Sequence, residues 1–582
     1  MSASSADAAA SRTRHHRRGS SLSSLFAGGA AADAGGRPPM ESPLKQVNSE
    51  PLAHQPKVVT LYNRLFEPGH SPGYWVEFFL LKANPDELAR VLRADPQRFI
   101  TQPETVHTLV RAAVANLGAD LPPDIVGNAL QVLSTVVGVT LDLHAAGSFP
   151  GVSVIQTLTG IENASAVFDD LTSKVLALLY AANRQLVGET TAFVLHVARK
   201  LWGTQISALF STKNFFAALI AIIDRQIDDS AAVNALLCIG ALTALNIYDD
   251  DGASVYKQRL NDYVDEAVMT KILALAQHEL IPTGQPAPDQ SVFSWVSSWF
   301  DRPAQAPQEQ QAAEKPSVVL PLFLFTVHNS VFSSQFAASP ALPALISSSV
   351  GRPPSHEWLA LLTMRTLVDS DFNELTDPKL QAIIRLHTPK LVLDTSRRVP
   401  LAGILDFAAI ILGSAADADA DIALIGQAAD LVYQVCAQLV ATTMIWTYNW
   451  TQLWRKVLKA VKALVRGPEP AVISRLLTVL VGMALRRDLL EEEDWRALLF
   501  VVVQNKKLFE DVAAKFPALA SQPALTAARN MTAQYELSPE QPDFVLIQRQ
   551  GGLAGRVIGE KLRPFSASLP AVKRAVRAEY GR

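Results

Sequence analysis

Three aspartates at Asp417, Asp419 and Asp421 have the spacing that opens a calcium-binding loop. In such a loop the sixth position is a glycine, because the backbone turns sharply there, and the twelfth is a bidentate glutamate. In this chain the two positions are Ile422 and Ala428. The segment therefore lacks both the turn and a required ligand, and we predict no calcium site and no other metal site.

Motifs for catalysis and cofactor binding are incomplete. The phosphate-cradling pattern G-x-x-x-x-G-K-[ST] is absent from the sequence. His278-Glu279 and His356-Glu357 each lack the second histidine of a zinc-binding H-E-x-x-H helix. We expect a non-enzymatic protein with no catalytic residues, no cofactor and no small-molecule substrate. An enzyme of unrecognised type remains an alternative, because an active site can combine positions that are far apart in sequence.

A purely basic face runs along the segment 446–466, which contains no Asp or Glu. At about 100° per residue, its cations fall on one side of an α-helix. They are Arg455, Lys456, Lys459, Lys462 and Arg466. Such a face is either the solvated back of a core helix or a contact for lipid headgroups or an acidic protein. We take these five residues as the candidate contact with an anionic surface.

The opposite side of the same segment is aromatic. Trp446, Trp450 and Trp454 follow one another at four-residue spacing, which stacks them along one side of an α-helix. Valines and leucines continue this side as far as Val465. We predict that the three tryptophans belong to the structural core.

Composition excludes some partners and compartments. Of the 582 residues, 49% are hydrophobic, which is ample for large buried cores. The net charge of −3 gives no overall nucleic-acid-binding signature, and we expect no nucleic acid as partner. Cys238 and Cys436 are the only cysteines and lie in apolar stretches. They are predicted to be small buried hydrophobic residues of a protein in a reducing compartment.

A membrane-spanning helix is a second alternative. The segment 431–454 carries no charge and is followed by Arg455 and Lys456. However, Gln434, Gln438 and other amides interrupt it, whereas a span requires about 20 predominantly apolar residues. An integral membrane protein with a span near 431–454 therefore remains open.

The chain divides by composition. Residues 1–55 are rich in Ser, Ala and Gly and are expected to be a disordered tail. Residues 56–280 are predicted to be an N-terminal helical-repeat region, and 281–316 a Pro-rich linker. Residues 317–535 are predicted to be a C-terminal armadillo-like helical domain, and 536–582 a basic tail.

Helix-start signals recur in the first helical region. Asn84-Pro85-Asp86-Glu87 has an N-cap, a proline at the first helical position and an acidic third position. Thr101-Gln102-Pro103-Glu104 is predicted to repeat this arrangement. Successive helices with short polar joints, and few alternating strand patterns, predict an all-α, armadillo/HEAT-like α-solenoid.

Within the linker, the segment 291–300 has an aromatic face and a serine face. The aromatic face includes Phe293, Trp295, Trp299 and Phe300. A short uncharged helix of this kind is typical of a lipid-packing sensor or a docking peptide, and the alternative is that it folds back onto the solenoid. We take these four residues as a candidate docking segment.

Two strings, YWVEFFLLKANPDEL at Tyr74–Leu88 and YNWTQLWRKVLKAVKAL at Tyr448–Leu464, resemble the family of armadillo-like helical domain-containing protein 3. The second string corresponds to that family's C-terminal domain of unknown function. The resemblance implies an all-helical, non-enzymatic protein of the cytosol and Golgi surface. It also implies partners of the Golgi phosphoinositide and Arf machinery, namely phosphatidylinositol 4-kinase III beta and an Arf guanine-nucleotide exchange factor.

These observations lead to one hypothesis of function. We expect a helical-repeat scaffold or adaptor, peripheral on the cytosolic face of Golgi membranes, that supports Golgi organisation and secretion by binding proteins. An anionic membrane surface is a further expected contact.

Overall fold

The structure is a computed structural model that describes residues 56–537, except 202–203, 205, 212, 227, 246–254, 282–316, 351, 385–396 and 418–419. The predicted disordered tail 1–55, the candidate docking segment 291–300 with Phe293, Trp295, Trp299 and Phe300, and the chain from 538 onward lie outside the described residues.

The described elements are almost entirely helical. The helices before the Pro-rich segment are α1 (Lys57–Asn63), α2 (Pro72–Leu80), α3 (Pro85–Ala94), α4 (Arg98–Thr101), α5 (Pro103–Ala115), α6 (Pro123–Ala145), α7 (Val154–Thr159), α8 (Ala164–Leu179), α9 (Arg184–Lys200), α10 (Ile206–Ser211), α11 (Phe216–Arg225), α12 (Asp229–Leu245), α13 (Val255–Asp262) and α14 (Glu266–Leu280).

The later helices are α16 (Val319–His328), α17 (Ser330–Ala337), α18 (Ala341–Ser349), α19 (Pro354–Ser370), α20 (Phe372–Thr376), α21 (Pro400–Gly413), α22 (Ile422–Thr442), α23 (Trp450–Leu464), α24 (Pro470–Ala484), α25 (Glu492–Gln504), α26 (Lys506–Lys515), α27 (Pro517–Ala520) and α28 (Pro523–Leu537). Three short 3₁₀ turns are η1 (Pro378–Leu380), η2 (Ser414–Ala416) and η3 (Arg487–Leu489). The strands described are β1 (Ala382–Ile383) and β2 (Arg397–Arg398), which pair antiparallel.

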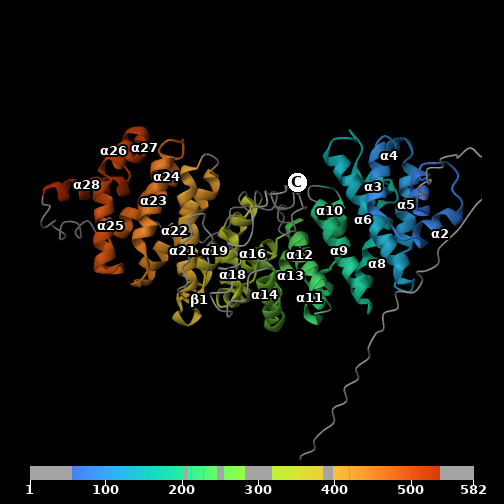
Figure 1. Ribbon diagram of the computed structural model, residues 1–582, viewed down its shortest axis with the longest axis horizontal. Coiled ribbons are helices and arrows are strands. Elements are labelled where there is room, and N and C mark those ends of the chain that lie inside the picture. Colours follow the sequence, from blue (N-terminus) through green and yellow to red (C-terminus); the bar gives the residue numbers. More distant parts are fainter. Residues whose placement is uncertain are drawn as a thin grey trace, which may run out of the picture. The chain divides into compact units, whose positions relative to one another are not determined.

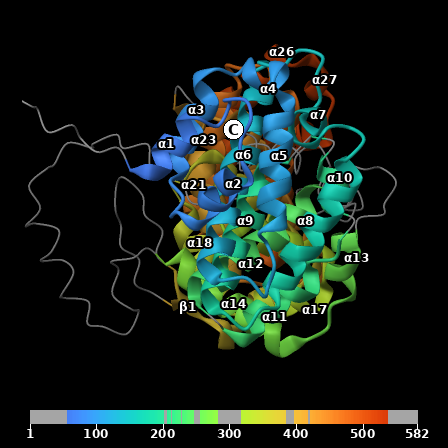
Figure 2. The ribbon, with the colours of Figure 1, turned by 90° about the vertical axis from the view of Figure 1, so that its right-hand side faces the viewer.

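The helices stack in two adjoining rows, because each packs mainly on helices near it in sequence (Figure 1). One row contains α3, α6, α9, α12, α16, α19, α22, α24 and α28, each in contact with the next. The other contains α5, α8, α11, α14, α18, α21, α23 and α25 in the same manner. Consecutive helices pair across the rows, as α5 with α6 and α8 with α9 (Figure 2). This nearest-neighbour stacking is an α-solenoid of the armadillo/HEAT kind.

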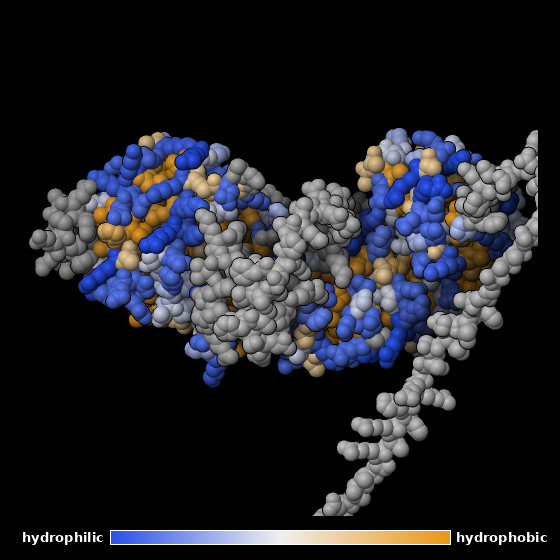
Figure 3. All heavy atoms as spheres, in the orientation of Figure 1, coloured by the Kyte–Doolittle hydropathy of each residue, from blue (hydrophilic) through white to orange (hydrophobic). Residues whose placement is uncertain are grey.

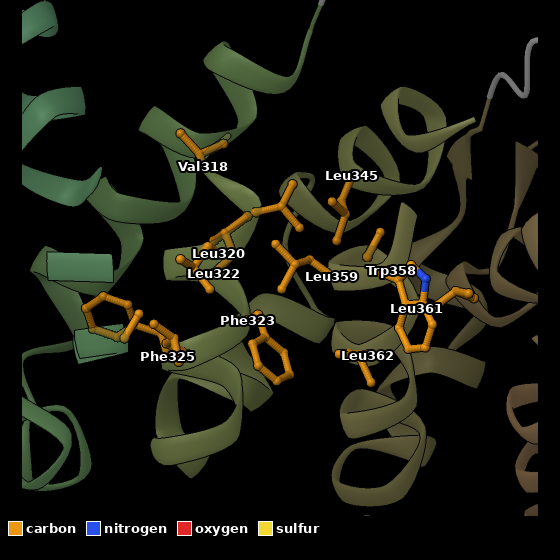
Figure 4. Close-up of a cluster of buried hydrophobic side chains, with 14 of the residues drawn as sticks. Val318, Leu320, Leu322, Phe323, Phe325, Leu345, Trp358, Leu359, Leu361 and Leu362 are labelled. Carbon is orange, nitrogen blue, oxygen red and sulfur yellow. The ribbon is translucent and has the colours of Figure 1, made fainter. Parts of the chain in front are cut away.

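The packing continues across the Pro-rich segment. Helix α12 contacts α16, and α14 contacts α17 and α18. Figure 4 shows Leu320 and Phe323 of α16 with Leu345 of α18 and Leu359 of α19 in one buried cluster. The described helices on both sides of the segment belong to one compact unit.

Of the two predicted helix starts, the one at Asn84 is confirmed and the one at Thr101 is wrong in its cap. The Asn84 side chain accepts a hydrogen bond from the Glu87 backbone N–H at 3.3 Å, so the first N-cap is confirmed. The second prediction is wrong in its cap: Thr101 ends α4, and Gln102 precedes α5 without a side-chain cap. The proline at the first helical position fixes that start by itself.

The segment 431–454, which is the alternative membrane span, does not form one continuous helix. Helix α22 ends at Thr442, Thr443 has a left-handed φ of 50°, and α23 begins only at Trp450. By length and composition alone, α6 and α22 could each cross a membrane. Within the protein, 72% and 67% of their most apolar windows are buried.

The contact between α12 and α16 generates a prediction about two glycines. A Cβ at Gly240 of α12 would lie 2.9 Å from Cδ of Pro321 in α16, whereas a Cβ at Gly188 of α9 would meet nothing within 4 Å. Gly240→Ala is expected to destabilise the protein by about 1–3 kcal/mol through overpacking. Gly188→Ala is expected to stabilise it by about 0.5–1 kcal/mol, because glycine is unfavourable inside a helix. Chemical denaturation measures both; an equal gain for both variants would contradict the tight contact.

The buried His356 and the partly buried His328 predict acid sensitivity. Burial, with a smaller effect of a nearby cation, lowers the pKa of His328 and of His356 to about 4. Their neutral forms therefore stabilise the fold above about pH 6.5, and this stability is lost as the pH falls toward 4. Replacing both with glutamine should reduce the loss of unfolding free energy between pH 7 and pH 5 by on the order of 2 kcal/mol for each histidine. Thermal melts across this range test it, and an unchanged pH slope would contradict it.

Candidate functional site: the basic face of α23

Helix α23 is held by its aromatic side. Trp450 and Trp454 are fully buried, with parallel rings whose centroids lie 5.4 Å apart. This side packs on α21, α24 and α25. At the start of the helix, the Asn449 side chain accepts a hydrogen bond from the Gln452 backbone N–H at 3.3 Å. The orientation of α23, and thus of its basic side, is set by these contacts.

The predicted stripe of three tryptophans on one helix is wrong for Trp446. This residue lies before α23 and is half-buried, and its ring stacks on that of Tyr448 at 5.3 Å between centroids. Its backbone oxygen accepts a hydrogen bond from Trp450 Nε1 at 3.2 Å. Trp446 thus contacts Trp450 from the connection before α23, and not from the preceding turn of the same helix.

A buried polar contact fixes this connection to α21. Tyr448 Oη donates a hydrogen bond to Asp406 Oδ1 at 2.8 Å, and Arg398 pairs with the same carboxylate. Burial raises the pKa of Asp406, while the bonds from Tyr448 and Arg398 act against this. The connection is therefore tied to α21 by a satisfied charge rather than by apolar packing alone.

All five predicted basic residues are exposed, but they divide into two groups. Lys459 Nζ donates to the backbone oxygen of Gly413 at 2.8 Å, at the C-terminal end of α21. Lys456 lies against the same glycine, since a Cβ there would be 3.1 Å from its Nζ. Cations are favourable at the negative end of a helix dipole. These two lysines therefore have a structural role.

The second group is Arg455, Lys462 and Arg466. Within the described part of the chain, none of the three forms an ion pair. At about 100° per residue, Arg455 and Lys462 lie about 20° apart on α23. The placement of Arg466 on the same helix is wrong, because α23 ends at Leu464 and Arg466 lies in the turn that follows. Lys515 of α26 donates to the backbone oxygen of Val465 and adds a cation at the end of α23. The result is an exposed stripe of uncompensated positive charge.

Residues that suggested metal or thiol chemistry have structural roles. Asp421 caps α22 by accepting from the Ala423 and Leu424 backbone N–H groups, and it also accepts from Trp358 Nε1 at 3.3 Å. No group of three or more His, Cys, Asp or Glu among the described residues could hold a metal ion. Cys238 and Cys436 are buried as predicted, and burial raises the pKa of both thiols.

The sequence also contains Gly69-His70-Ser71-Pro72-Gly73, which has the G-x-S-x-G spacing of a nucleophile elbow. An elbow requires a strand before the serine, whereas here a turn after α1 leads into α2. Ser71 is the N-cap residue of α2, and His70 Nε2 lies 2.9 Å from the Leu65 backbone oxygen. The histidine ring stacks on Tyr74 instead of contacting the serine hydroxyl.

Two grooves at the N-terminal end are shallow and open. One is lined by residues 56–58 and 81–85, and the other by one face of α3 that includes Arg90 and Arg93. Neither contains a histidine, cysteine, serine or tyrosine. The basic stripe of α23 is therefore the best-defined candidate site in the described residues.

The different surroundings of two tryptophans can be tested directly. Trp450→Ala should lower the unfolding free energy by about 3–5 kcal/mol, because it opens a cavity in a fully buried position. Trp446→Ala should cost clearly less, because its ring is only partly buried and lies outside the helix. Denaturant titration of the purified variants measures both. Equal costs would mean that Trp446 is as deeply packed as Trp450.

Comparisons with known proteins leave the family open. No family model matches the sequence, and no curated protein is detectably similar to it. One solved structure, from work on a conserved phosphorylation switch that controls the interaction between cadherin and beta-catenin, aligns with 91% of this chain and 99% of its own. The sequence identity is 13% and the TM-score is 0.30. A likeness this distant carries no argument, so the fold assignment depends on the helix packing itself.

Proposed function

We propose that this protein is a non-enzymatic helical-repeat scaffold that binds other proteins and attaches peripherally to an anionic membrane surface through α23. The supporting observation is the exposed stripe of Arg455, Lys462 and Arg466, without an ion pair among the described residues. Consistent with the resemblance in its sequence, we propose the cytosolic face of the Golgi as that membrane, with a role in Golgi organisation and secretion.

Simple electrostatics favours the membrane contact. A cation near an anionic leaflet contributes about 1 kcal/mol, and the attraction decays over a Debye length of about 8 Å at physiological salt. Arg455 and Lys462 share one side of α23, and the exposed Arg466 follows in the next turn of the chain, so the three cations can approach a flat surface together. By contrast, like charges on one helix face repel one another modestly when nothing compensates them. The stripe therefore gains more from an external anionic surface than from its own protein.

The stacking of the rows suits a scaffold. Ion pairs join consecutive helices of the α3–α28 row: Asp142 of α6 pairs with Arg93 of α3 and Lys200 of α9. Asp430 of α22 similarly pairs with Arg365 of α19 and Arg475 of α24. Solenoids offer extended surfaces for protein partners. By resemblance, we propose phosphatidylinositol 4-kinase III beta and an Arf guanine-nucleotide exchange factor as these partners.

Two other functions are less well supported. As membrane spans, α6 and α22 would have to leave a core in which most of each helix is buried. Carbonate extraction separates the possibilities, because a peripheral scaffold is released and a spanning protein stays in the pellet. For an enzymatic role, the two grooves at the N-terminal end supply no histidine, cysteine, serine or tyrosine.

The membrane contact predicts the behaviour of a triple variant. Arg455→Glu, Lys462→Glu and Arg466→Glu leave the lysines at Gly413 in place, so the fold should survive. Binding to phosphatidylcholine vesicles that contain phosphatidylinositol 4-phosphate should weaken at least tenfold, since each lost cation removes about 1 kcal/mol. Vesicle flotation at low and high salt measures this.

A matched control reverses three exposed cations on other helices, Arg184, Arg225 and Arg259. This variant has the same net charge as the first and should float nearly as well as wild type. If both variants lose binding equally, net charge rather than the stripe is responsible. If the α23 variant floats like wild type, the stripe is only the solvated back of a helix.

A further inference from the structure

Two exposed apolar side chains in the second helical region lie on segments next to α23. Among the described residues from 317 to 537, the exposed large hydrophobic side chains are Ile445, 63% exposed, and Phe500, 51% exposed. Ile445 lies in the connection that leads into α23, and Phe500 lies on α25, which packs against α23. The helix with the basic stripe is therefore flanked by two apolar projections.

Phe500 and the basic stripe point away from the same neighbour. Both α23 and α25 pack on α24, and Trp495 of α25 donates from Nε1 to the Ala484 backbone oxygen at 2.8 Å. The buried side of α25 includes Leu498 and Val502. Phe500 projects from the opposite side of the helix. The exposed sides of α23 and α25 therefore belong to one surface.

The two apolar residues differ in their electrostatic surroundings. Thr447 Oγ1 donates to Glu491 Oε1 at 3.0 Å, which brings the start of α23 and the start of α25 together. Ile445 therefore lies at an end where five acids outnumber three arginines. The acids are Asp488 and residues 491–494, and the arginines are Arg486, Arg487 and Arg496, which pair with Asp488 or Glu492. Because the two contacting helices start side by side, they run in the same direction. Phe500 is nine residues beyond Glu491, about 13 Å along α25, at the level of the later turns of α23.

Those later turns are cationic. They carry Lys459 and Lys462, Arg466 follows just after the helix, and Lys515 donates to the Val465 backbone oxygen. Exposed acids on α26, Glu510 and Asp511, are matched in number by Lys506 and Lys507. The excess positive charge in this region thus comes from α23. On the face of the molecule in Figure 3, hydrophobic residues (orange) lie among hydrophilic ones (blue).

We propose that Phe500 is a hydrophobic anchor that enters the interfacial layer of an anionic bilayer while the α23 stripe contacts the headgroups. An aromatic side chain beside cations is the arrangement that favours interfacial insertion. An anionic surface attracts the basic end with Phe500 and repels the acidic end with Ile445. This inference depends on the proposed membrane attachment and assigns it a depth and an orientation.

An environment-sensitive label distinguishes the two ends. Phe500→Cys and, as matched control, Ile445→Cys are labelled with nitrobenzoxadiazole; Cys238 and Cys436 are buried and should not react. Vesicles of phosphatidylcholine with phosphatidylserine should shift the emission of the label at position 500 to the blue and leave that at position 445 nearly unchanged. Vesicles of phosphatidylcholine alone should shift neither.

Affinity provides the second measurement. Phe500→Ser should weaken binding to the anionic vesicles about tenfold or more, and the loss should persist at high salt because it is apolar in origin. Ile445→Ser should change binding less than about twofold. Melting temperatures of both variants should stay near wild type, because both side chains are largely exposed.

The outcomes separate the two proposals. If wild type binds anionic vesicles but neither label responds, Phe500 is not an anchor and the membrane attachment stands. If wild type does not bind at all, both proposals fail. An equal shift at both positions overturns the charge-based orientation. A response to soluble polyglutamate that equals the response to vesicles would replace the bilayer with an acidic protein.

Discussion

Helices that are apolar on more than one side impose the constraint from which this architecture follows. Nearly all of α12 is buried, and no single partner can cover a helix all round. Its sides are covered by α9, α11 and α16, and α16 in turn requires α19. Each helix thus needs the next one, which gives two rows of nearest neighbours instead of a closed bundle.

Polar groups in such a stack must find partners at helix ends and between rows. Asn329 caps α17 and also donates to the backbone oxygens of Leu260 and Tyr263, across the Pro-rich segment in the sequence. Lys459 likewise donates to a backbone oxygen, that of Gly413 at the end of α21. A cation on a helix face is therefore not automatically available for a ligand, and structural partners must be assigned first.

The sequence predicts those features of the structure that depend on neighbouring residues. Helical periodicity and the cap at Asn84 depend on a few neighbouring residues, and both were predicted correctly. Trp446 was misplaced because spacing of four residues cannot distinguish a helical turn from a connection that folds beside it. The partner of Lys459 lies forty-six residues away, and the exposure of Phe500 depends on how α25 packs on α24. Such properties require the tertiary structure.

The charge pattern of α23 is difficult to explain by folding alone. A helix back that only faces solvent gains stability from Glu and Lys at four-residue spacing, and α23 has no acid at any position. The end of α21 compensates Lys456 and Lys459. Arg455, Lys462 and Arg466 remain, and their mutual repulsion gives no benefit within the described protein. An anionic surface would remove this cost, and the exposed Phe500 on the neighbouring helix α25 would suit a bilayer better than a purely polar partner.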